Sequence, residues 1–149
     1  MIKKLMSMEI LESLPLERYL EIGKDVSRIN PEELDDELMR QASTYTYFSI
    51  LESEAHQLYE TAMSEFLRYQ STAKVEERER RQRDKQKATD KSLEDWVSAQ
   101  PEYQELLSNT IEADGRRKRI RGIVRGLEQR KDTLIQLSSN KRAESKIYH

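Results

Sequence analysis

Residues 30–73 decide the fold, and their sequence is NPEELDDELMRQASTYTYFSILESEAHQLYETAMSEFLRYQSTA. Asn30 and Pro31 are typical of a helix start, because Asn caps helices and Pro suits the first helical position. Apolar residues then recur at alternating spacings of three and four, with Gln41 and Glu52 in the gaps. They are Leu34, Leu38, Tyr45, Phe48, Ala55, Tyr59, Ala62, Phe66, Tyr69 and Ala73. This spacing predicts a long helix with coiled-coil-like packing.

The scarcity of helix breakers sets the expected length of this helix. No Gly or Pro interrupts the chain between Pro31 and Pro101, so the helix is expected at about 31–87. A connector at 88–100 is expected to hold a short helix capped by Ser92. Pro101 then opens a second long helix at about 101–140. Its apolar face includes Tyr103, Leu106, Ile120, Val124, Leu127 and Leu134. Together these elements predict an all-α fold, a long antiparallel helical hairpin spanning 31–144.

The two ends of the chain predict less regular structure. Residues 1–30 are expected to form an N-terminal short helical segment, which Pro15 opens and Gly23 ends. Residues 145–149 are expected to be a loose tail.

Composition narrows the class of protein. Of 149 residues, 36% are hydrophobic and 36% charged, with four Gly, three Pro and no Cys. The lack of cysteine excludes disulfide scaffolds and thiolate metal sites. No apolar run reaches the roughly 18–20 residues that a membrane span requires, and no signal peptide is evident, so we expect a cytoplasmic protein without a membrane partner. A hairpin this long exposes so much surface that we also expect a homo-oligomer.

The sequence offers no catalytic constellation. It has no glycine-rich phosphate loop, no acid-rich calcium loop and no nucleophile motif, and its two histidines, His56 and His149, lie far apart. We therefore expect a protein that is not an enzyme and has no cofactor and no metal.

Charge is strongly polarised along the chain. Residues 1–65 hold six basic and fourteen acidic side chains, leaving 20 of the 26 bases and 14 of the 28 acids for the remainder. The net charge of −2 therefore conceals an acidic first part and a basic second part. Such asymmetry indicates either an anionic partner or complementary contacts between subunits.

Two groups of bases stand out. The first basic stripe comprises Lys74, Arg78, Arg81 and Lys85. Their spacing places them within about 60° of arc on a helix. This stripe fits a phosphate backbone, and it fits equally a solvated helix face paired with neighbouring acids.

The second group, the arginine cluster, comprises Arg116, Arg117, Lys118, Arg119, Arg121 and Arg125. Arg117, Arg121 and Arg125 stand four residues apart, and like charges at this spacing repel by a few tenths of a kcal/mol, roughly, per pair. A compensating anion is therefore expected, either a nucleic-acid backbone or the acids of another subunit. Arginine favours phosphate or carboxylate through its planar fork.

Three glycines lie in the same stretch, at Gly115, Gly122 and Gly126. Glycine inside a helix costs up to about 1 kcal/mol relative to alanine. Their clustering on one face indicates that another backbone approaches closely. A packed helix is the favoured partner and a nucleic-acid strand the alternative.

An ordered set of residues runs through about 20–144. It comprises Asp25, Val26, Ile29, Leu34, Tyr45, a basic helical middle, Lys91-Ser92-Leu93, Tyr103, Gln129-Arg130, Leu134, Arg142 and Glu144. In this order of features the chain resembles the UvsY-like recombination mediators of tailed phages. The acidity of residues 1–65 and the tight arginine cluster have no counterpart in that pattern.

The resemblance implies a ring-like homo-oligomer that binds single-stranded DNA and contacts a recombinase and a single-strand binding protein. It implies that basic residues carry the binding. The expected nucleic-acid-binding residues are therefore taken from the two basic groups, without Arg119: Lys74, Arg78, Arg81, Lys85, Arg116, Arg117, Lys118, Arg121 and Arg125. A non-enzymatic coiled-coil adaptor, whose charges make subunit interfaces, is the alternative.

Overall fold

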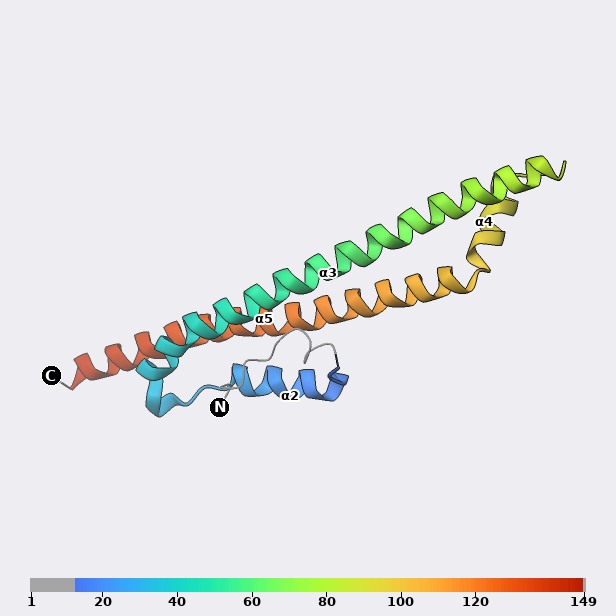
Figure 1. Cartoon of the computed structure of the whole chain (residues 1–149). Helices are drawn as coiled ribbons and strands as arrows, with labels where there is room; N and C mark the ends of the chain where they lie inside the picture. The colour runs from blue at the N-terminus through green and yellow to red at the C-terminus, as the bar shows by residue number, and fades with distance from the viewer. Residues whose placement is uncertain (1–12, 149) are drawn as a thin grey trace. The chain divides into compact units, whose positions relative to one another are not determined.

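The computed structural model describes residues 13–148, and 89% of this part of the chain is helical, with no strand. The elements are α2 (Leu16–Ser27), η1 (Pro31–Glu33), α3 (Leu34–Arg83), α4 (Asp90–Ser98) and α5 (Pro101–Ile147), as Figure 1 shows. The all-α fold and the packed pair of long helices are thereby confirmed. None of these helices is long and apolar enough to cross a membrane.

The chain divides into two compact units, each with its own packing. The first unit is Met1–Ala55 with Arg116–His149, and the second unit is His56–Gly115. Both long helices contribute to both units.

Three helices form the first unit: α2, the beginning of α3 and the end of α5. The last two run antiparallel, since Gln41 bonds to Leu127 while Glu52 pairs with Arg121. All three helices supply the core: Tyr19, Val26, Phe48, Leu51, Ala55, Ile120, Ile123, Val124 and Leu127. Helix α2 lies along α5 (Figure 1) and covers one side of the long pair.

Helix α2 begins after Pro15, as expected, but it does not end at Gly23. It continues to Ser27, because Val26 is buried in the core and the apolar face holds the last turn in place. Helix α2 packs closely against Gly126 of α5, where an added Cβ would lie 3.1 Å from the Ser27 hydroxyl oxygen. The expected approach of a packed helix is therefore seen at Gly126.

A buried polar network crosses the first unit beside the apolar core. The Arg130 guanidinium donates to Glu37, to the Gln41 side-chain oxygen at 2.5 Å and to the Arg28 carbonyl at 3.2 Å. Gln41 in turn donates to the Leu127 carbonyl at 2.7 Å. Burial lowers the pKa of Arg130 from its usual range. The network fastens the turn after α2 to both long helices.

The ends of α3 illustrate local control of helix boundaries. Asn30 caps η1, the short helix that leads directly into α3, as expected, and its side chain accepts a bond from the Glu32 amide at 3.1 Å. The far end lies at Arg83, before the expected limit near residue 87. There the Gln86 amide bonds to the Arg81 carbonyl at 2.8 Å and Lys85 adopts φ 54°, which together make a Schellman turn without glycine.

The second unit packs α4 and the first turns of α5 against the end of α3. The rings of Phe66 and Tyr103 pack at a tilt, with 5.0 Å between their centroids, and Leu93 and Val97 of α4 are buried. Helix α4 is capped by Thr89, whose hydroxyl accepts from the Ser92 amide at 3.2 Å. The cap expected at Ser92 thus lies one turn earlier.

Helix α5 runs on to Ile147, past the end expected near residue 140. No Gly or Pro follows Gly126, so the two serines and the asparagine at 138–140 do not break the helix. Of the tail expected at 145–149, residues 145–147 are helical, and His149 lies outside the described residues.

Candidate nucleic-acid interface

Two bases of the first basic stripe face acids of α4 within the second unit. Lys74 pairs with Glu94 at 3.2 Å and with Asp90 at 3.6 Å, and Arg78 pairs with Asp90 at 3.0 Å. Both acids are well exposed, with side chains 76% accessible at Asp90 and 68% at Glu94. The charges of Lys74 and Arg78 are therefore neutralised by acids of the same unit. Because these ion pairs are exposed to solvent, each stabilises the fold by at most about 1 kcal/mol.

Arg81 belongs to a tighter arrangement. Its guanidinium donates to Glu77 at 2.8 Å and to the Ser92 hydroxyl at 2.8 Å, and Arg80 donates to the same carboxylate at 2.7 Å. The hydrogen bonds from Arg80 and Arg81 lower the pKa of Glu77 to about 2. Arg81 is only 14% exposed, so it joins α3 to α4 and offers little surface to a ligand.

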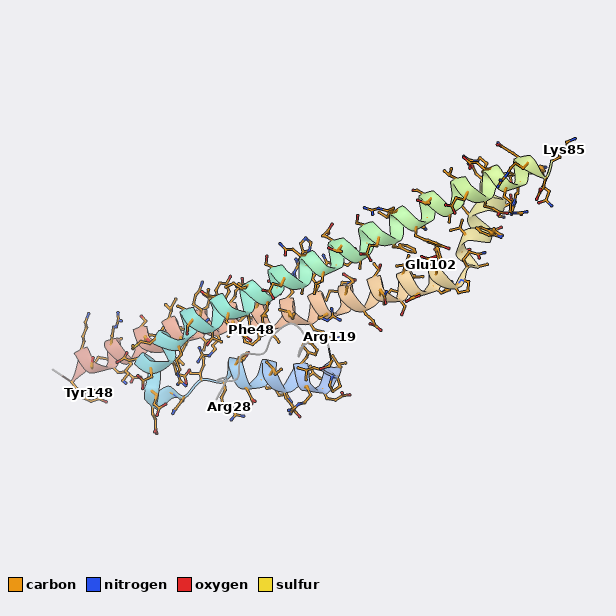
Figure 2. All side chains as sticks on the ribbon, in the orientation of Figure 1. Arg28, Phe48, Lys85, Glu102, Arg119 and Tyr148 are labelled. Atoms are coloured by element: carbon orange, nitrogen blue, oxygen red, sulfur yellow. The ribbon has the colours of Figure 1, made fainter. Side chains whose placement is uncertain are left out.

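Lys85 does not extend the stripe along the helix. It lies two residues past Arg83, the last residue of α3, and occupies the turn, where Figure 2 shows it beyond the end of that helix. The structure thus brings together only three of the four expected residues on one helical face: Lys74, Arg78 and Arg81.

The arginine cluster lies on α5 in the first unit, and its members differ in their surroundings. Arg121 pairs with Glu52 of α3 at 3.0 Å, with half of its side chain exposed. Arg116 and Arg117 are half-buried, and both interact within the chain. Like-charge repulsion along the helix is thus relieved in part by neighbouring residues of the same chain.

Arg125 differs from the others. It is exposed, and it makes no hydrogen bond or ion pair with any residue of 13–148. Lys118, two helical turns before it, is exposed as well, although it interacts within the chain. Gly122 stands between them, and an added Cβ there would meet no atom within 4 Å. The packed helix expected at all three glycines is therefore absent at Gly122 within the described part of the chain.

Arg119, which was not among the expected site residues, borders a groove of the first unit. Its guanidinium lies 5.5 Å from the Tyr19 ring centroid, and Figure 2 shows it on the side of α5 that faces α2. The groove encloses about 530 Å³ and is lined by Leu16, Tyr19, Leu20, Gly23, Lys24, Ser27, Arg119, Gly122 and Ile123. Most of its apolar side chains, Leu16, Tyr19 and Leu20, come from α2, which the charge pattern of α5 alone could not reveal.

The remaining chemistry of the described residues is sparse. His56 lies near Glu60 of the same helix at 3.7 Å, and no three metal-ligating side chains gather between residues 13 and 148. Comparison with protein-family models, with curated proteins and with solved structures returns no match.

Proposed function

We propose that the chain is a recombination mediator that binds single-stranded DNA and promotes loading of a recombinase in place of a single-strand binding protein. The exposed bases of the arginine cluster on α5 make the DNA contact, and no catalytic step is involved. The carrying observation is Arg125, exposed and without a partner among residues 13–148. The order of sequence features shared with UvsY-like mediators supports the biological role.

The physical reason is charge compensation. Lys118 and Arg125 hold two positive charges on one exposed side of a helix, in a region where bases predominate. A phosphate backbone neutralises such charges and releases its condensed counterions, which makes binding favourable at low salt. The first basic stripe contributes less, because Lys74 and Arg78 already pair with the acids of α4.

Assembly completes the mechanism. We infer a ring-like homo-oligomer with coiled-coil-like helix packing, in which each chain contributes a few bases along the bound strand. Weak phosphate contacts then add by avidity. A strand held in an extended or wrapped path is available to a recombinase where single-strand binding protein has been displaced.

The test is DNA binding at low and moderate salt. Wild type is expected to bind an oligodeoxythymidylate tightly at low salt and to lose affinity steeply as salt rises. Lys118→Ala/Arg125→Ala should weaken binding and reduce the salt slope by about 0.7 for each phosphate that is no longer neutralised. Lys141→Ala/Lys146→Ala removes two exposed bases from the same helix and is the matched control.

The mediator role has its own readout. The protein should shorten the lag before a recombinase assembles on DNA covered by single-strand binding protein. If the protein binds DNA tightly but does not shorten the lag, it is a DNA-binding protein and the mediator role is refuted.

A second candidate is a coiled-coil adaptor whose charged side chains form ion pairs between helices and between subunits. The specific observation in its favour is that Lys74, Arg78 and Arg121 all pair with acids of their own chain. The adaptor predicts no binding of single-stranded DNA at either salt concentration. It also predicts that Arg121→Ala lowers thermal stability.

A further inference from the structure

Gly122 lies inside a long helix without a packing reason among the described residues. It is exposed, and the space where its Cβ would stand is open. Gly126, four residues on, differs because α2 approaches it closely. Glycine weakens a helix relative to alanine, so Gly122 carries a stability penalty that no contact in the described part of the first unit offsets.

The surroundings of Gly122 are basic. Residues three and four apart on a helix are neighbours, with about 5–6 Å between their Cβ atoms. Lys118, Arg119 and Arg125 stand at these spacings, and all three are exposed. Lys24 of α2 lines the same groove as Gly122, and it makes no ion pair within residues 13–148. Four cationic side chains thus border Gly122, which has no side chain of its own.

The groove beside Gly122 is apolar. Leu16 and Leu20 are 51% and 59% exposed, and Ile123 forms part of the opposite wall. The volume of about 530 Å³ lies within the roughly 300–1,000 Å³ typical of small-molecule pockets. Arg119 stands at the rim, with its guanidinium 5.5 Å from the Tyr19 ring centroid, and its exposed side chain carries a planar group that can stack on a second flat group.

We propose that this groove is the nucleotide-binding element of the chain: a backbone phosphate sits at Gly122, and the attached base lies in the apolar groove against Arg119. Charge complementarity selects the occupant, since a strand offers anionic phosphates at the basic rim and a flat apolar base for the groove. Guanidinium and aromatic groups both stack on bases without regard to sequence. The proposal rests on the proposed function and specifies where and how the strand is held.

The first experiment compares how substitutions at Gly122 change thermal stability and how they change DNA binding. Gly122→Ala should raise the thermal unfolding midpoint by about 2–4 °C, because alanine favours the helix. Gly122→Leu fills the phosphate position and should weaken binding of an oligodeoxythymidylate about tenfold, the effect expected when one base no longer stacks and its phosphate is no longer held. Asn140→Leu adds a leucine to an exposed position of the same helix and should leave binding unchanged.

The second experiment separates charge from stacking at Arg119. Arg119→Lys keeps the charge but removes the planar group, so affinity should fall while the salt slope stays constant. Arg119→Ala should lower both the affinity and the salt slope. A bromodeoxyuridine-substituted strand should crosslink to the segments 16–27 and 116–125.

The outcomes are distinct. If wild type binds no single-stranded DNA, the proposed function fails. If wild type binds but Gly122→Leu binds equally well, or crosslinks fall elsewhere, the strand takes another path and only the assignment of the groove fails. Should Gly122→Leu lose its helical signal, Arg119→Lys still decides, and an unchanged affinity there overturns the stacking role.

Discussion

Arg130 is the buried charge on which the first unit depends. It is 7% exposed, and Glu37, its partner, is 6% exposed. Removing one member of a buried pair costs about 3–5 kcal/mol, because the other charge stays buried. Arg130→Met should lower the free energy of unfolding by about 3 kcal/mol, at the lower end because Arg40 still donates to Glu37. Urea denaturation measures this.

The double variant Arg130→Met/Glu37→Leu is the control, because both charges leave the interior together. It should recover most of the stability that the single variant forfeits, since apolar replacements of buried ion pairs are often neutral. Equal instability of the single and double variants would show that the missing hydrogen bonds of Arg130, and not the orphaned carboxylate, cause the effect.

Glu77 makes the second unit sensitive to acid. Its pKa of about 2 lies below the ordinary 4.5, because Arg80 and Arg81 donate to the ionised form. The carboxylate therefore stabilises the fold above pH 4.5, and this contribution is lost as the pH falls toward 2. Glu77→Gln should melt below wild type at about pH 6, and the two midpoints should converge as the pH falls through this window.

Glu76, the exposed neighbour, supplies the control. Glu76→Gln removes the same charge without removing either arginine bond, so its difference from wild type should not follow the same course. A constant gap between Glu77→Gln and wild type from about pH 6 to well below the ordinary carboxyl pKa would contradict the linkage.

Among the helices, α4 places acidic side chains over the first basic stripe. Asp90 and Glu94 bind Lys74 and Arg78 through exposed ion pairs, which a competing phosphate can displace at little expense. Asp90→Asn/Glu94→Gln should uncover both bases, raise affinity for single-stranded DNA and steepen its salt dependence. Fluorescence anisotropy at several salt concentrations measures both quantities.

The control for this change is Asp95→Asn, on the same helix but without an ion pair in the described residues. Helicity is followed by circular dichroism, because Asp90 also favours the first turn of α4. If the double variant binds no better than Asp95→Asn, the stripe offers no latent surface for DNA.

Elements also show what the sequence could and could not predict. Apolar spacing sufficed for the two long helices, since burial of one face governs helix formation over many turns. It missed the end of α3 and the cap of α4, because the turn at Lys85 and the cap at Thr89 depend on a few local hydrogen bonds. The sequence pattern located the basic residues but not the acids that pair with them, because tertiary packing brings Asp90 to Arg78 and Glu52 to Arg121.

At the scale of the whole molecule, a net charge of −2 opposes general attraction to DNA. Within the arginine cluster, Arg121 is paired and Arg125 is without a partner among residues 13–148. One chain therefore offers few phosphate contacts, and each weakens quickly with salt. Useful affinity requires several copies of this surface on one strand, which is the reason to expect assembly.

Strand length tests this requirement. For a homo-oligomer, affinity should rise steeply once an oligodeoxythymidylate reaches from one subunit to the next, because the second contact becomes intramolecular. Strands of roughly 10, 20 and 40 nucleotides span the range, and light scattering gives the mass of the free protein and of each complex. Lys118→Ala/Arg125→Ala should lower the affinity for long strands more than for short ones, since it weakens every repeated site at once. A monomeric mass, with affinity rising only in proportion to strand length, would contradict assembly and leave one weak site per chain.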